Sequence, residues 1–172
     1  MMSSEKKEYN PFLDGLHLSL DVGCGFFPKG DVNVDLHTEP SGHRLETTAL
    51  PVKCIPNFVK ADGHYLPFTS NTFDVVYSSH FIEHVPEPER CLDEMVRVTK
   101  SRVKLWFPHW LGERKSASHL HHFKVRWFIA YANSRGLAII KNVSNWKHFP
   151  NEFLSIIRVP RENEILFLKP RK

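Results

Sequence analysis

The chain has 172 residues, a length that favours a single domain, residues 1–172, with a core large enough to fold without disulfides. Its hydrophobic fraction of 41% and charged fraction of 24% are ordinary for a globular protein, and no apolar run reaches the length of a membrane span. The formal net charge of +4 permits a nucleic-acid partner without requiring one. Three widely spaced cysteines argue against a disulfide framework and favour a cytoplasmic location. Residues 1–10 lack the apolar core of a signal peptide and are expected to form a flexible tail.

Strand and helix patterns alternate along the chain, which is typical of a sheet with crossover helices. Apolar and alternating runs predict seven strands, at residues 16–22, 32–36, 58–62, 73–77, 103–107, 137–143 and 165–168. A helix is predicted from about 86–89 to 100, because two prolines favour its start and apolar residues then recur at helical spacing. A second helix is predicted over 124–135, where Gly136 is a natural stop.

Polar or glycine residues follow four successive predicted strands, at the sheet edge where open α/β folds bind their ligands. The first strand runs into Gly23-Cys24-Gly25, and glycines let the backbone approach a ligand closely. Asp35, near the end of the second strand, is placed to accept both hydroxyls of a ribose. Asp62, at the end of the third strand and before Gly63, is placed to accept a hydrogen bond from an adenine amino group. Each signal is weak alone, but together they predict a nucleoside-type ligand.

The motifs Leu20–Gly25, Val34–Asp35, Lys60–Gly63 with Leu66–Phe68, Phe73–Val85 and Arg97–Thr99 are similar to those of the type 11 group of class I S-adenosylmethionine (SAM)-dependent methyltransferases. The resemblance covers about residues 16–108. It implies an α/β fold with a Rossmann-like, seven-stranded, mostly parallel sheet whose last strand is antiparallel. It also implies that a loop holds the methionine end of SAM, Asp35 the ribose and Asp62-Gly63 the adenine, with two serines near the sulfonium. The implied cofactor-binding residues are Asp21, Val22, Gly23, Cys24, Gly25, Phe26, Asp35, Leu36, Asp62, Gly63, Ser78 and Ser79.

Two features depart from the pattern of that family. Phe27 stands where a third glycine is usual, and only Phe26–Asp31 separates the first two strands. A crossover with a helix normally needs a dozen or more residues, so we expect the first crossover helix to be reduced or absent. The first two strands also alternate, and one face of each suits water or a polar contact. That thinly covered face is therefore expected to be wet or to be covered by a second subunit in a homodimer.

Methyl transfer from SAM is an in-line displacement, to which an enzyme contributes mostly positioning and, where the acceptor loses a proton, a base. His80 follows the fourth strand and is the preferred catalytic candidate. Glu83 and His84 are weaker candidates, because they can bond backbone near the helix entry. The acceptor stays open between a small molecule, a protein and RNA. The run Ser78–Phe81 argues against exocyclic N-methylation of a base, since several such enzymes carry an Asn-Pro-Pro-Tyr type motif there.

Histidines gather after the fifth predicted strand, at His109, His119, His121 and His122. Imidazoles bind zinc and other transition metals, but no paired ligand set stands at a known spacing, so we predict no metal site and expect wet histidines in a substrate-side loop. An alternative for this region is a basic and aromatic patch that binds nucleic acid, formed by Trp110, Arg114, Lys115 and Arg126. The preferred interpretation is that these are solvated charges of a loop.

The leading prediction is a SAM-dependent methyltransferase with an unidentified acceptor and no membrane partner. The alternative is a SAM-binding regulatory protein or an inactive partner subunit, which Phe27 and the short first crossover motivate. A third prediction, a domain that binds NAD or another nucleotide, is disfavoured because Leu20–Gly25 lacks the third glycine that such sites use for helix packing.

Overall fold

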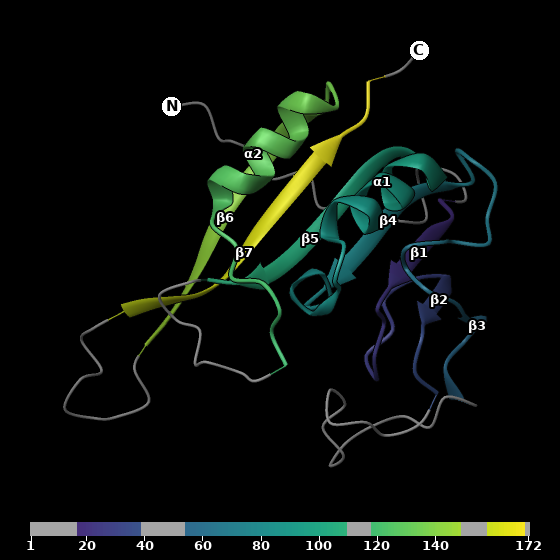
Figure 1. Cartoon of the computed structure of the whole chain (residues 1–172). Helices are drawn as coiled ribbons and strands as arrows, with labels where there is room; N and C mark the ends of the chain where they lie inside the picture. The colour runs from purple at the N-terminus through teal and green to yellow at the C-terminus, as the bar shows by residue number, and fades with distance from the viewer. Residues whose placement is uncertain (1–16, 39–53, 110–117, 149–157, 171–172) are drawn as a thin grey trace, which may run out of the picture.

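The computed structural model describes residues 17–38, 54–109, 118–148 and 158–170. Seven strands form one sheet in the order β3-β2-β1-β4-β5-β7-β6 (Figure 1). The first five strands pair in parallel, and β7 runs antiparallel to both of its neighbours, as expected for the predicted Rossmann-like sheet. The strands are β1 Ser19–Val22, β2 Val32–Asp35, β3 Phe58–Lys60, β4 Phe73–Ser79, β5 Thr99–Pro108, β6 Ala138–His148 and β7 Arg158–Leu168.

Two α-helices, α1 Pro88–Val98 and α2 Val125–Ser134, cover one face of the sheet (Figure 1). They contact each other, because Tyr131 Oη of α2 donates to Asp93 of α1 at 2.8 Å. Both predicted helices are confirmed; α1 ends before residue 100 because Thr99 already pairs with β4. Among the described residues, no helix is both long and apolar enough to cross a membrane.

The core lies between these helices and the sheet. The apolar stripe of α1 packs inward, and Leu92 and Met95 are fully buried. Under α2, the rings of Phe107 and Phe128 have centroids 4.3 Å apart, and Phe167 of β7 completes the stack. Aromatic pairs of this kind contribute about 0.5–1.5 kcal/mol each beyond their area burial, so the helical periodicity of the sequence is used for packing.

The connection from β1 to β2 contains no helix, as its length predicts. The chain instead turns back along β1: Lys29 N donates to Asp21 Oδ2 at 2.9 Å. A Cβ atom on Gly30 would lie 2.6 Å from the backbone nitrogen of Asp21, so the two segments touch through their backbones. A helix, whose side chains need several ångströms, does not fit at this distance.

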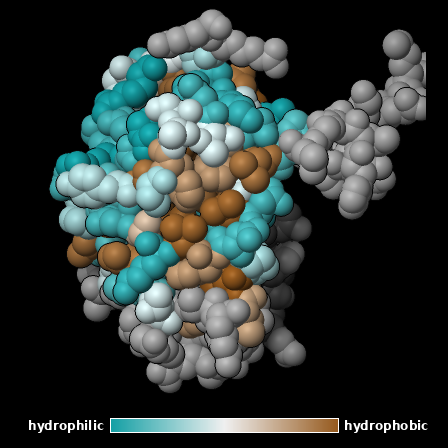
Figure 2. Space-filling model, turned by 90° about the vertical axis from the view of Figure 1, so that its right-hand side faces the viewer, coloured by the Kyte–Doolittle hydropathy of each residue, from teal (hydrophilic) through white to brown (hydrophobic). Residues whose placement is uncertain are grey.

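The polar face of β1 and β2 is therefore covered by the chain itself. Asp21 and Asn33 are 2% and 0% exposed. The amide of Asn33 donates to the carbonyls of Gly30 and Pro56, at 2.9 Å each. The expectation that this face would be wet or covered by a second subunit is wrong at these two positions, because loop backbone supplies the partners. Apolar surface does remain on the side where β1–β3 lie (Figure 2), and a homodimer stays a prediction.

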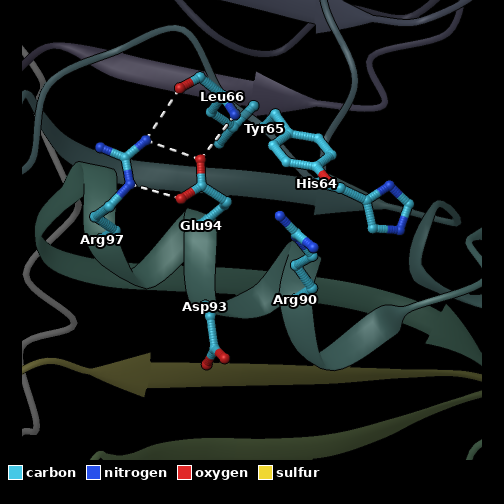
Figure 3. Close-up of a pocket in the computed structure, with 7 residues that line it drawn as sticks. All are labelled: His64, Tyr65, Leu66, Arg90, Asp93, Glu94 and Arg97. Carbon is cyan, nitrogen blue, oxygen red and sulfur yellow. Dashed lines mark hydrogen bonds and ion pairs between the residues drawn. The ribbon is translucent and has the colours of Figure 1, made fainter.

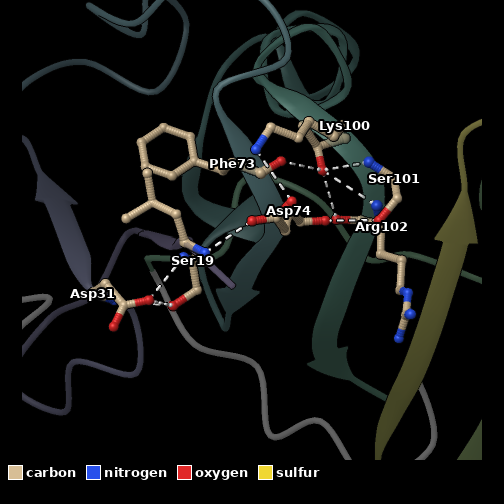
Figure 4. A network of polar contacts seen from close by, with 9 residues as sticks. Ser19, Asp31, Phe73, Asp74, Lys100, Ser101 and Arg102 are labelled. Carbon is tan, nitrogen blue, oxygen red and sulfur yellow. Dashed lines mark hydrogen bonds and ion pairs between the residues drawn. The ribbon is translucent and has the colours of Figure 1, made fainter. Parts of the chain in front are cut away.

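A network of polar contacts ties together the amino-terminal ends of four strands, β1, β2, β4 and β5 (Figure 4). Asp31, just before β2, accepts from the Ser19 backbone at 2.8 Å and from its hydroxyl at 2.6 Å. Asp74 of β4 accepts from Leu18 N at 2.9 Å and from Lys100 of β5 at 3.2 Å. These contacts lie at the amino-terminal ends of the strands, opposite the loops that carry the predicted site. They fix the register of the strands and so align the carboxyl ends from which those loops start.

Candidate functional site

The loop after β1 is held in place by two glycines in the left-handed region, Gly23 at φ 71° and Gly25 at φ 53°. Its backbone folds over the end of β2, since Gly23 N and Cys24 N both donate to Val34 O, at 2.9 and 3.1 Å. A Cβ atom on Gly23 would lie 2.3 Å from the ring of Phe81. Glycine is therefore required at position 23 for two reasons: the backbone angle is left-handed, and the ring of Phe81 occupies the space that a side chain would need.

Gly63, after β3, packs against the far end of the same aromatic ring. A Cβ atom there would lie 2.7 Å from Phe81 Cζ. Phe81, which follows β4, thus holds the loops after β1 and β3 at a fixed separation. Sequence reasoning named both glycines but missed Phe81, since nothing local indicates that residues 23, 63 and 81 meet.

Asp21 carries the most unusual electrostatic environment of the site. Its side chain is 2% exposed, and Oδ2 accepts from Lys29 N, while Oδ1 has no hydrogen-bond partner among the described residues. Burial raises the pKa of Asp21 to about 6, against the lowering effects of the hydrogen bond from Lys29 and of its charge. A buried carboxylate oxygen without a partner costs free energy in the folded protein and favours a cationic or hydrogen-bond-donating ligand.

Asp35 ends β2 beside this loop. Its Oδ2 accepts from Gly25 N and its Oδ1 from His37 N, both at 2.9 Å. Each carboxylate oxygen has a second lone pair, so these bonds orient the group without using its full capacity to accept. The half-buried carboxylate is thereby fixed on the strand next to β3, beside the loop that carries Asp62, as the ribose prediction requires.

Asp62 follows β3, where its Oδ1 accepts from His64 N at 2.9 Å and lies 2.6 Å from His64 Nδ1. Burial alone would raise the pKa of Asp62, but these contacts outweigh it and lower the pKa. Asp62 is therefore ionised at neutral pH and able to accept hydrogen bonds. Asp35 and Asp62 lie at the carboxyl ends of adjacent strands, so the structure brings these two predicted residues to one edge.

The remaining predicted cofactor residues differ in burial. Val22 and Cys24 are buried in the core, Phe26 is half-buried and Leu36 is exposed. Ser78 is 2% exposed, and its hydroxyl has no hydrogen-bond partner among the described residues. Ser79 is half-buried and ends β4.

His80 directly follows β4 with a left-handed φ of 51°, a strained conformation for a residue with a side chain. Its two ring nitrogens lie between carboxylates: Nδ1 is 3.4 Å from Glu83 Oε1 and Nε2 is 3.3 Å from Glu162 Oε2. Glu83, above all, raises the pKa of His80, with Glu162 in the same direction. The protonated ring is favoured, so the predicted role as a neutral base is less suited to this position than a role in positioning an acceptor.

A clamp from α1 holds the connection between β3 and β4 (Figure 3). Arg97 donates to both oxygens of Glu94, at 2.6 and 2.8 Å, and to the carbonyls of Phe68 and Leu66, at 2.7 and 3.0 Å. Glu94 in turn accepts from Leu66 N at 2.8 Å. Leu66, which these bonds hold, lies three residues after Gly63, so the clamp restrains the loop that carries Asp62. In the sequence, Arg97 stood out only as part of a family likeness, because the two carbonyls that it binds lie 29 and 31 residues away along the chain.

The surface around this clamp forms a pocket of about 400 Å³. Arg90 stacks on Tyr65, with its guanidinium carbon 4.0 Å from the ring centroid. Glu94 and Arg97 pair with each other inside the pocket, whereas Asp93 pairs with Arg135, which does not line it. The pocket therefore supports the neighbouring loop. Its lining residues are His64, Tyr65, Leu66, Arg90, Asp93, Glu94 and Arg97.

The histidines after β5 separate into different environments. His119 packs edge-to-face on His84, with ring centroids 4.7 Å apart, while His122 is exposed. His121 stacks on Phe123, and burial lowers the pKa of His109. The predicted basic, aromatic patch depends on residues 110–117, which lie outside the described residues.

Residues 20–107 match the model of a methyltransferase domain family. An uncharacterized methyltransferase of Mycobacterium leprae (strain Br4923) is 36% identical over 102 residues, which are 54% of this chain and 38% of that protein. The chain thus spans less than half the length of this curated relative.

Solved structures share the fold across most of the chain. A SAM-dependent methyltransferase from Thermotoga maritima superposes with a TM-score of 0.68 at 20% identity, covering 92% of this chain and 85% of that one. The [4+2]-cyclase SpnF superposes with a TM-score of 0.67 at 16% identity, covering 94% of this chain and 78% of that one. At these identities the likeness concerns the fold. The family match over half of its length shows that the chain belongs to this methyltransferase domain family, and its fold is the one that class I SAM-dependent methyltransferases share.

Proposed function

We propose that this protein binds SAM at the loop after β1 and transfers its methyl group to an acceptor. The observation that supports this most is Asp21, a buried carboxylate with an unpartnered oxygen beside a loop of left-handed glycines. The methionine end of SAM carries an ammonium group, which satisfies such an oxygen and neutralises its charge. Asp35 and Asp62 follow on the neighbouring strands in the order that a ribose and then an adenine require.

The absent first helix favours SAM over a dinucleotide. Dinucleotide sites place a pyrophosphate at a helix N-terminus, where the helix dipole and the free N–H groups stabilise negative charge. Here β1 is followed by a turn without a helix, and the nearest buried charge is the carboxylate of Asp21. This environment repels a phosphate and attracts a cation. The absence of the first helix departs from the usual family pattern, but it agrees with a site that binds the zwitterionic methionine end of SAM.

The acceptor belongs to one of three classes: a small molecule, a protein or RNA. The groups that face the acceptor side are those after β4, where Ser79 and His80 lead away from the sheet edge. We propose that His80 orients the acceptor. Enzymes of this chemistry act chiefly by holding the nucleophile in line with the sulfonium, and an imidazole ring held between two carboxylates is fixed in position for that task.

Two measurements on the full chain test this proposal. Isothermal titration with SAM, its demethylated product and NAD distinguishes the cofactor; tighter binding of NAD than of SAM contradicts the assignment. Incubation with tritiated SAM and a cell extract, fractionated into RNA, protein and small molecules, then identifies the acceptor class. Incorporation above a heat-inactivated control supports methyl transfer.

The alternative, a SAM-binding regulatory or inactive partner subunit, is motivated by the short first crossover and by Phe27, which is 69% exposed where the family has glycine. The similarity to a cyclase also shows that this fold serves more than one chemistry. Tight SAM binding without incorporation into any fraction supports this second function. Sedimentation at micromolar concentration tests the proposed homodimer, which a monomer contradicts.

A further inference from the structure

Glu83 is the most deeply buried carboxylate outside the proposed cofactor loop. It lies in the short 3-10 helix η2, Ile82–His84, and is 1% exposed. Neither of its carboxylate oxygens accepts a hydrogen bond from any described residue. Its nearest charged neighbour is His80, whose Nδ1 lies 3.4 Å from Oε1. A carboxylate this deeply buried is costly unless a cation stands against it, and it has two oxygens for that purpose.

Two imidazoles lie beside this carboxylate. One ligand atom each from Glu83, His84 and His119 can be chosen so that all lie within 4.8 Å of one another. In a tetrahedral zinc site, ligand atoms about 2.0–2.2 Å from the metal are about 3.3 Å apart. The three side chains therefore need only modest rotations to close on one ion.

The backbone around the three side chains is already fixed. Leu120 N and His121 N both donate to the carbonyl of Glu83, at 2.9 and 3.2 Å. His84 Nδ1 lies 2.9 Å from the carbonyl of Ser118. Because a carbonyl only accepts, Nδ1 is the donor in this contact, and Nε2 is the ring atom that would bind a metal ion. Metal-binding histidines are oriented by this type of second hydrogen bond.

We propose that Glu83, His84 and His119 bind a divalent transition-metal ion. Two imidazoles and one carboxylate suit Zn²⁺, and three protein ligands leave a fourth position for water or another oxygen ligand. Glu83 has a second oxygen with which to keep its contact to His80. The site joins the segment after β4 to the segment that precedes α2, and it does not depend on the proposed binding of SAM.

Zinc titration of the full chain without SAM tests this inference, with a chromophoric chelator as competitor. We expect one Zn²⁺ per chain. We expect His119→Gln and His84→Gln each to weaken binding at least about 100-fold, more than the loss of an outer partner causes. His122→Gln removes an exposed neighbouring imidazole and should leave the affinity unchanged, as should His17→Gln at the far end of β1. The assignment is overturned if the wild type binds Zn²⁺ no more tightly than His119→Gln does. It is also overturned if His122→Gln loses as much zinc affinity as His119→Gln.

Cobalt provides a second measurement on the unaltered protein, which keeps the test independent of how each variant folds. Co²⁺ bound by two nitrogens and one carboxylate in a four-coordinate site gives intense visible absorption, which titrates to one equivalent and disappears when Zn²⁺ displaces it. Weak absorption typical of hydrated Co²⁺ overturns the proposal. Either outcome leaves the titration with SAM unaffected, so failure of the metal site and failure of the proposed function are distinguishable.

Discussion

Asp21→Asn should make the protein more stable and worse at binding SAM. The substitution keeps an oxygen to accept from Lys29 N and removes the buried charge at the unpartnered position. Burial raises the pKa of Asp21 from its usual 3.8 to about 6 in the folded protein. That difference corresponds to about 3 kcal/mol, which is an upper limit for the cost of ionising the group in the folded state.

The sign of the pH dependence follows from where the proton is held. The folded protein binds the Asp21 proton more tightly than the unfolded chain, so the contribution of this group to the free energy of unfolding falls as pH rises from about 3.8 to 6. Below about pH 3.8, Asp21 is protonated in both the folded and the unfolded chain, and its full contribution to the free energy of unfolding is present. At pH 7 we expect Asp21→Asn to be about 1–3 kcal/mol more stable than the wild type, a rise in Tm of about 2–10 °C. At pH 4 the two proteins should differ little.

SAM affinity should move in the opposite direction. If the ammonium group of SAM meets the Asp21 carboxylate, removing that charge costs about 30-fold or more in affinity. For the wild type, binding selects the ionised carboxylate, so affinity should rise with pH up to about 6 and then level off. Thermal melts and titration calorimetry at pH 4 to 8 measure both effects. Glu87→Gln, which removes an exposed carboxylate, is the control and should change neither. A less stable Asp21→Asn, or one that binds SAM as well as the wild type, refutes the reasoning.

Gly23→Ala should lower the free energy of unfolding by about 2–4 kcal/mol, because it strains a left-handed backbone and displaces the ring of Phe81. Gly25→Ala should lower it by only about 1–2 kcal/mol, because open space surrounds that position. Urea unfolding measures both losses. Equal losses would contradict the packing role of the ring. Arg97→Lys should lose about 1–3 kcal/mol, because a compact ammonium with three donors cannot reproduce the four bonds that the planar guanidinium makes to Glu94, Phe68 and Leu66; chemical denaturation measures the loss. His80→Gln should lower the rate of methyl transfer while leaving the SAM affinity from calorimetry unchanged; a large drop in affinity would instead place His80 at the cofactor.

Much of the fold was predictable from local patterns. Alternation with period two and apolar recurrence at helical spacing identified the seven strands and both helices, because these periods reflect backbone geometry that neighbouring residues share. The extents differ most in the last two strands: β6 and β7 are longer than predicted, since an antiparallel pair extends as far as its ladder of hydrogen bonds allows. The missing first helix followed from chain length alone, because six residues cannot form a turn, a helix and a return.

The sequence by itself determined which residue types stand at the ends of the strands: the two glycines, Asp35 and Asp62. The periods of strands and the preference for glycine in turns follow local rules, so these positions could be named in advance. The tertiary structure alone decided that Asp21 is buried by its own loop. It also decided that Phe81 separates Gly23 from Gly63, and that Glu83 and His84 meet His119 across 35 residues of chain. Such contacts depend on how the segments beyond the sheet edge fold over one another. The spacing of residues along the chain carries no record of that arrangement.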